Sequence, residues 1–164
     1  MRLTLTIFLS FAAIASFSQS TNNNENKSAY KFVELKYGIA KPKVPNQPVT
    51  RDSAWGKGPY QYFKVIKVTD SVEAKINNHF GVEFRVEGMD NPDVHFTEEW
   101  IYASPMMEEG RKYGSTRTNS TVIANKPSTA SYVFKKSAEL LKGKWKLNIY
   151  IENRQAYSKN FIVY

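Results

Sequence analysis

The sequence holds few residues that could carry out acid–base or metal chemistry. It has two histidines, His79 and His95, and no cysteine. Neither histidine has a second one two or four positions away, so the spacing does not indicate a zinc-binding pair. The sequence also lacks a Gly-x-Ser-x-Gly elbow that would carry a serine nucleophile. We therefore expect no catalytic residue, no metal site and no cofactor.

Two pairs of consecutive glutamates remain as candidates for acid–base chemistry, Glu98-Glu99 and Glu108-Glu109. Neighbouring side chains of a regular strand point to opposite faces, so Glu98 and Glu99 cannot converge on one substrate. Glu108 and Glu109 fall in residues 104–118, where prolines and glycines predict a long loop. A glycosidase needs two carboxyls facing each other across a cleft, which a small sandwich seldom has. The glutamate pairs therefore do not predict an enzyme.

Two turns resemble ligand-binding loops only in part. Residues 90–93, Asp-Asn-Pro-Asp, are rich in oxygen atoms but lack the spaced acidic series of strong calcium loops. Residues 55–59, Trp-Gly-Lys-Gly-Pro, lack the second half of a phosphate-loop motif and have no strand leading into them. We interpret both segments as turns.

An aromatic and basic cluster at Tyr60, Tyr62 and Lys64 is the one candidate binding surface. Aromatic rings beside a cation can stack on sugar rings, although aromatics also fill sandwich cores and pair across strands. The formal charge is +8, but the basic residues are scattered and form no run of five or six. That distribution is typical of a solvated surface. Because the first eighteen residues predict export and an exported protein rarely meets nucleic acid, a glycan is favoured over nucleic acid as a partner.

Short alternating segments separated by turn residues predict an all-β protein. Eight segments read as strands: residues 30–40, 60–69, 80–87, 94–102, 120–124, 131–135, 143–151 and 156–164. Almost no helix is indicated beyond one turn at 137–142, and residues 41–59 and 104–118 read as long loops. Strands of this length and spacing predict an immunoglobulin-like antiparallel β-sandwich of seven or eight strands.

The clearest alternation lies in the closing hairpin. Trp145, Leu147, Ile149 and Ile151 are expected to face the core. The intervening positions should then form a wet, basic outer face: Lys144, Lys146, Asn148 and Tyr150. In the first strand the same period places Val33, Leu35, Tyr37 and Ile39 on one face.

The first eighteen residues have the pattern of a signal peptide. A basic start, Met1-Arg2, precedes an apolar run over residues 3–17 that is short for a membrane span. An uncleaved anchor is the alternative. We expect residues 1–18 to be a signal peptide, 19–29 a disordered polar leader and 30–164 the folded domain. The domain would be exported to the periplasm or cell surface of a Gram-negative bacterium, without stable membrane insertion after cleavage.

Three segments together resemble a known family. They are residues 35–39, the Phe-Gly strand at 79–86, and the Gly-Trp corner at 139–145 with the closing 161–163. The sequence is similar over about residues 31–164 to an uncharacterised family of small exported bacterial proteins, a domain of unknown function. This resemblance implies an immunoglobulin-like fold and transfers no activity. One departure follows Glu98, where the family suggests a proline-rich join and this sequence continues Glu99-Trp100-Ile101-Tyr102.

These observations favour a non-catalytic binding or accessory module of the bacterial envelope. Its partner would be another envelope protein or a glycan, contacted through loops 41–59 and 104–118. Two alternatives stay open: a small outer-membrane β-barrel, and a small envelope hydrolase whose site is built from loops. The oligomeric state is not indicated by the sequence.

Overall fold

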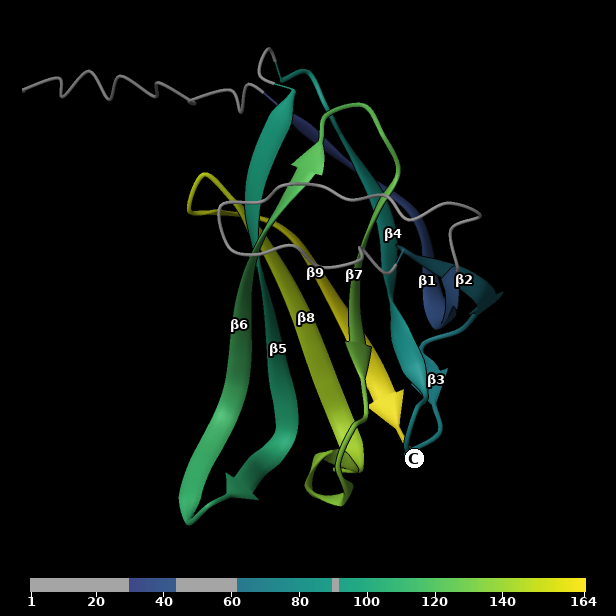
Figure 1. The fold of residues 1–164 in the computed structure, drawn as a ribbon, viewed down its shortest axis with the longest axis vertical. Helices are drawn as coiled ribbons and strands as arrows, with labels where there is room; N and C mark the ends of the chain where they lie inside the picture. Colours follow the sequence, from purple (N-terminus) through teal and green to yellow (C-terminus); the bar gives the residue numbers. More distant parts are fainter. Residues whose placement is uncertain (1–29, 44–61, 90–91) are drawn as a thin grey trace, which may run out of the picture.

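The structure is a computed structural model that describes residues 30–43, 62–89 and 92–164. The described residues form nine strands and one 3-10 helical turn, η1 (Ser137–Glu139) (Figure 1). The strands are β1 (Lys31–Lys43), β2 (Tyr62–Val68), β3 (Ser71–Val72), β4 (His79–Glu87), β5 (Asp93–Glu108), β6 (Arg111–Ile123), β7 (Ser128–Val133), β8 (Gly143–Ile151) and β9 (Arg154–Val163). The predicted signal peptide, leader and most of loop 41–59 lie outside the described residues.

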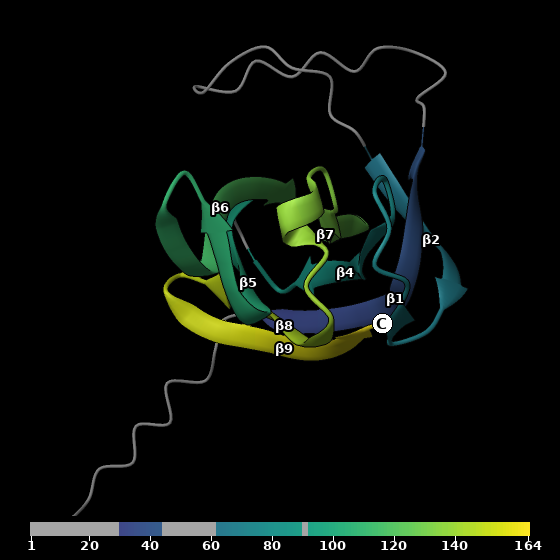
Figure 2. The same ribbon diagram turned by 90° about the horizontal axis from the view of Figure 1, so that it is seen from below.

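The strands form two sheets that pack face to face. One sheet has the order β2-β1-β4-β7, and the other has the order β3-β9-β8-β5-β6. In Figure 2, β4 and β7 lie above the curved layer of β5, β8 and β9. Both sheets are open at their edges. The described residues therefore do not form the single closed sheet of the alternative prediction, a small outer-membrane β-barrel. The predicted all-β sandwich is confirmed.

The core between the sheets is rich in aromatic side chains. Phe80 of β4 is fully buried and lies at its centre. Its ring centroid is 5.1 to 6.0 Å from those of Trp100, Phe134, Trp145, Phe161 and Tyr132. The inward face predicted for the closing hairpin is confirmed, since four of its side chains are fully buried: Trp145, Leu147, Ile149 and Ile151. Alternation along β4 and β8 is thus what assembles the core.

The described part of the chain has one strand more than the eight that the sequence predicts, and this additional strand is β3. It spans only Ser71–Val72 and pairs in parallel with β9, Ser71 opposite Ile162 and Val72 opposite Val163. Two residues are too few for a period to be seen in the sequence. Because of this pair, the larger sheet is mixed rather than wholly antiparallel.

The prediction of a long loop at residues 104–118 is wrong, because most of these residues belong to two strands. β5 continues to Glu108 and β6 starts at Arg111, so the two strands form one long hairpin. Glu109 and Gly110 turn the chain with φ of 49° and 77°. Every side chain of β6 is exposed or half-buried, and its sequence therefore shows no alternation, although pairing with β5 holds it extended. Of loop 41–59, residues 41–43 continue β1 and pair with β2.

A bulge in β1 corrects the prediction that alternate residues of the first strand share one face throughout. The register with β4 shifts between Glu34 and Lys36. Phe32 precedes the shift and stacks on Phe84, whereas Tyr37 follows it and packs against the core. One extra residue exchanges the two faces, so Leu35, expected on the same face as Tyr37, is 37% exposed.

The helical corner predicted at 137–142 is present as η1. The Glu139 carboxylate accepts hydrogen bonds from the backbone N–H groups of Lys135 and Lys136, which fixes the start of the turn. After the turn, the Trp145 indole N–H donates to the Leu141 carbonyl at 2.6 Å. The corner therefore anchors β8 to the core.

No helix in the described part of the chain is long and apolar enough to cross a membrane.

Candidate functional site on the outer face of β5, β6 and β8

The predicted binding cluster is described only in part. Tyr60 lies outside the described residues, and Tyr62 is placed as the first residue of β2, opposite Lys43. Lys64 is exposed and pairs with Lys41. The neighbouring Phe63 is half-buried against His79, with the ring centroids 4.8 Å apart. A sugar-binding surface at Tyr60, Tyr62 and Lys64 therefore stays a prediction.

The two histidines lie on different sheets, His79 in β4 and His95 in β5. Burial and the nearby charge of Lys135 lower the pKa of His79. His95 is exposed, and its Nδ1 lies 2.9 Å from the hydroxyl of Thr121. The described residues contain no cluster of three or more potential metal ligands.

Glu98 and Glu99 do not converge, as expected for a regular strand. Glu98 lies on the side of β5 that carries the buried Phe96 and Trp100, whereas Glu99 lies on the outer side with Thr97. Burial raises the pKa of Glu98 to about 7, although the nearby Trp100 indole and the Ser131 backbone oppose the shift. The two carboxyl groups are therefore parts of different environments.

The outer face of the larger sheet carries a connected polar network centred on Glu99. Its carboxylate accepts hydrogen bonds from Arg117 Nε at 2.8 Å, Asn148 Nδ2 at 2.9 Å and the Tyr150 hydroxyl at 2.9 Å. The hydroxyl of Ser158 donates to Asn148 Oδ1 at 3.0 Å. We call these five residues the Glu99 network; they come from β5, β6, β8 and β9.

Strand register brings the Glu99 network together. Glu99 lies directly opposite Arg117 in β6 and opposite Asn148 in β8. Asn148 is only 3% exposed, and the Glu99 side chain is 10% exposed. Asn148 was expected on a wet face, and its burial corrects that expectation. Facing side chains pack over one another across neighbouring strands, which is why polar groups are buried there.

The donors around Glu99 determine its charge state. Partial burial acts to raise the pKa of its carboxyl, but hydrogen bonds from Asn148, Arg117 and Tyr150 outweigh this effect and lower the pKa. The same hydrogen bond to Glu99 is the main cause that raises the pKa of the Tyr150 hydroxyl. The Arg117 guanidinium also lies 5.6 Å from the centre of the Tyr150 ring. Glu99 is thus held as an anion at neutral pH.

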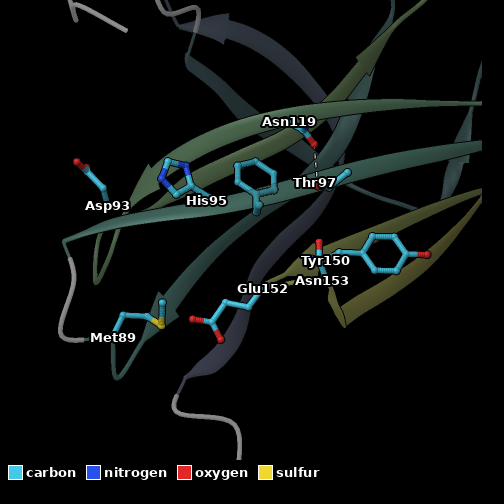
Figure 3. Close-up of a pocket in the computed structure, with 9 residues that line it drawn as sticks. Met89, Asp93, His95, Thr97, Asn119, Tyr150, Glu152 and Asn153 are labelled. Carbon is cyan, nitrogen blue, oxygen red and sulfur yellow. Dashed lines mark hydrogen bonds between the residues drawn. The ribbon is translucent and has the colours of Figure 1, made fainter. Parts of the chain in front are cut away.

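A shallow pocket of about 480 Å³ adjoins the network near the β8–β9 turn (Figure 3). Its lining combines the apolar side chains of Met89 and Phe96 with polar residues, which include Asp93, His95, Thr97, Asn119, Tyr150 and Asn153. The Thr97 hydroxyl donates to the Asn119 side-chain oxygen at 2.8 Å, the bond drawn dashed in Figure 3. Tyr150 belongs to both the network and the pocket lining, so the two form one continuous surface.

This surface can bind a polar ligand through many hydrogen bonds. Hydroxyl, amide, imidazole and carboxylate groups together offer both donors and acceptors. The pocket volume is within the range of small-ligand sites. Sequence reasoning missed the surface because its residues are separated along the chain. Polar residues at alternate positions of β5 and β8 are the only signal, and they acquire meaning only once the register is known.

Two open sheets packed around an aromatic core define an immunoglobulin-like β-sandwich. The fold is similar to that of an immunoglobulin-like protein from Pseudomonas aeruginosa, with a TM-score of 0.60 and 18% sequence identity. That match covers 82% of this chain and 96% of the other.

The family is shown directly by the sequence. Residues 29–163 match the model of the "Domain of unknown function (DUF3859)", and the chain belongs to this family. No curated protein matches the sequence. The resemblance to a domain of unknown function with an immunoglobulin-like fold is thus confirmed, and export stays a prediction.

Proposed function

We propose that this protein is a non-catalytic, exported binding module of the bacterial envelope that recognises a glycan. The recognition surface is the outer face of β5, β6 and β8 with the adjoining pocket. The observation that carries this proposal is the Glu99 network, in which five side chains from four strands are held by hydrogen bonds on an outward face.

Pre-organisation is the physical reason why this face suits a polar ligand. Side chains that are already fixed lose little conformational entropy on binding. Glu99 accepts hydrogen bonds from Arg117 and Tyr150 and so holds both side chains in place, while the polar groups of Asn119 and Asn153 lie at the adjoining pocket. A sugar ring presents several hydroxyls that both donate and accept, and such a ligand can satisfy several pocket groups together.

The placement of the candidate acid–base groups supports a binding module rather than an enzyme. The two histidines are on different sheets, and the consecutive glutamates of β5 are on opposite faces. General acid–base catalysis needs its groups within hydrogen-bond reach of one reacting atom. The export part of the proposal depends on the signal-like pattern of residues 1–18 and is tested by fractionating cells that express the full chain.

Binding of soluble, fluorescently labelled oligosaccharides from bacterial envelope polysaccharides, measured by fluorescence anisotropy, tests the ligand class. We expect Asn119→Ala to weaken binding about tenfold or more, because it removes a hydrogen-bonding group from the pocket. Lys64→Ala is the matched control, because Lys64 is exposed on the other sheet. Circular dichroism and thermal melting check that both variants are folded.

Two results would contradict the proposal. One is that no oligosaccharide of the set binds the full chain at millimolar concentration. The other is that Lys64→Ala weakens binding while Asn119→Ala does not, which would move recognition to the Tyr60, Tyr62 and Lys64 cluster.

A further inference from the structure

The outermost strand of the larger sheet, β6, has a long free edge. Among the described residues its only strand neighbour is β5, and it spans thirteen residues, Arg111–Ile123. The other edge strands are shorter, with seven residues in β2, two in β3 and six in β7. An edge strand presents unpaired backbone donors and acceptors that a further strand can use.

The hydrogen-bond pattern identifies which residues present those groups. The Ala124 N–H donates to the Pro92 carbonyl at 2.7 Å, just beyond the pair Asp93–Ile123. The register is regular from this pair to Ile101–Ser115. Backbone groups of alternate residues in an antiparallel strand point to opposite sides, so those directed away from β5 belong to the odd-numbered residues. These are Ser115, Arg117, Asn119 and Thr121.

Side-chain pairs hold β6 firmly on β5. Three consecutive outward positions of β5 are each bonded to the residue directly opposite. The pairs and distances are His95–Thr121 at 2.9 Å, Thr97–Asn119 at 2.8 Å and Glu99–Arg117 at 2.8 Å. The free edge is therefore pre-organised, and a partner strand would not have to order it.

The charge of β6 distinguishes between possible occupants. The strand contains three basic residues, Arg111, Lys112 and Arg117, and no acidic residue. Arg117 is paired with Glu99, so Arg111 and Lys112 are the charges that a partner strand would meet. A second copy of β6 would bring like charges together across the new pair, which disfavours self-association. A strand that carries glutamate or aspartate would instead meet opposite charge. The protein as a whole is also basic, with a formal charge of +8.

We infer that the free edge of β6 binds an extended, acidic segment of a protein partner by strand addition. Backbone hydrogen bonds to the odd-numbered residues of β6 would provide the affinity, and the basic side chains would select acidic sequences. This interaction is independent of glycan binding, because it uses the edge of the sheet rather than its outer face. The protein would thus bind an acidic protein segment at the edge of β6 and a glycan on the adjoining outer face of the sheet.

The test uses two blocked nine-residue peptides and the full chain. In one peptide glutamate alternates with valine and threonine, and in the other lysine replaces each glutamate. Hydrogen exchange followed by NMR is measured with and without each peptide. We expect the glutamate peptide to slow exchange of the Ser115, Arg117, Asn119 and Thr121 amides about tenfold, and the lysine peptide to have no effect.

Two variants assign the effect to the edge. Ser115→Pro removes one outward N–H, whereas Ser115→Thr keeps it and serves as the matched control. We expect only the proline variant to weaken binding of the glutamate peptide about tenfold. Lys112→Glu leaves the backbone donors of β6 in place. It should weaken binding of the glutamate peptide and strengthen binding of the lysine peptide. This variant keeps the inference testable if the proline variant unfolds.

Three outcomes would overturn the inference. Exchange in β6 could be unchanged by the glutamate peptide, or the protection could fall on β2 or β7 instead. The free protein could also form dimers in sedimentation with its β6 amides already protected, and the occupant would then be a second copy. A failure of glycan binding in the anisotropy measurement leaves this result unaffected, so the two proposals are distinguished.

Discussion

Glu98 and Glu99 are consecutive residues of β5, yet their carboxyl groups lie on opposite faces of the sheet and their pKa values shift in opposite directions. Burial raises the pKa of Glu98 to about 7. The hydrogen-bond donors of the Glu99 network lower the pKa of Glu99. One position along a strand therefore decides whether a carboxyl group resists ionisation or is held ionised.

Replacing Glu98 with glutamine should make the protein less sensitive to rising pH. The folded pKa of about 7 exceeds the ordinary value of 4.5, so the wild type loses stability as pH rises from about 4.5 to about 7. That shift corresponds to at most about 3 kcal/mol. We expect Glu98→Gln to lack this loss, as measured by urea unfolding at pH 4 and pH 8. Equal pH dependence in variant and wild type would show that Glu98 ionises freely in the fold.

Replacing Glu99 with glutamine should have the opposite pH signature. A lowered folded pKa stabilises the protein above the unfolded pKa, and this contribution is lost as pH falls through the folded pKa. Glu99→Gln should reduce the free energy of unfolding at pH 7 by about 1–3 kcal/mol. It should also reduce the sensitivity to acid. Urea titrations at pH 7 and pH 3 measure both effects; a variant as stable as the wild type at pH 7 would contradict a structural role for the network.

Gly81 should not tolerate a side chain. It lies in β4 opposite Gly38 of β1 and Ser131 of β7, and a Cβ there would be 2.1 Å from the Ala130 carbonyl oxygen. Because that oxygen belongs to the backbone, Gly81→Ala should destabilise the protein by about 3 kcal/mol or more. Gly114→Ala is the control, since no atom lies within 4 Å of its Cβ position. Thermal melts that rank the two variants the other way would contradict the packing of β4 against β7.

Trp145 should contribute to stability through both its ring and its indole N–H. It is fully buried and donates to the Leu141 carbonyl at 2.6 Å. Trp145→Phe leaves a cavity and an unpaired carbonyl, so we expect a loss of about 2–4 kcal/mol in urea unfolding. The neighbouring Lys144 is exposed, and Lys144→Ala should change stability by less than about 0.5 kcal/mol. A loss below about 1 kcal/mol for Trp145→Phe would show that the corner does not depend on this anchor.

The fold could be predicted where one face of a strand is buried and the other is wet. In β4 and β8 this condition holds, and their alternation located the core residues Phe80 and Trp145. In β6 every side chain is at least partly exposed, so residues 111–118 show no period and the sequence predicts a strand only at its end, over residues 120–124. The bulge at Leu35 could not be predicted for a related reason. One extra residue moves the following side chains of β1 to the opposite face without any change in the type of residue.

The candidate site could not be predicted because it depends on pairing between distant segments. A period of two assigns Asn148 to the outer face, but it does not say that Glu99 lies opposite. Only that contact turns an exposed position into a buried one. The sequence did establish that Glu98 and Glu99 diverge, since this follows from strand geometry alone.

The order of the larger sheet has a consequence for how the chain folds as it is made. β8 lies between β9 and β5 in the middle of that sheet, and β3 is held in it only by β9. Until residues 143–163 have been synthesised, β3 and β5 lack these neighbours and Phe80 lacks Trp145 and Phe161. Pairings between such distant segments form slowly and late. The two sheets can therefore enclose a complete core only after residues 143–163 have been synthesised.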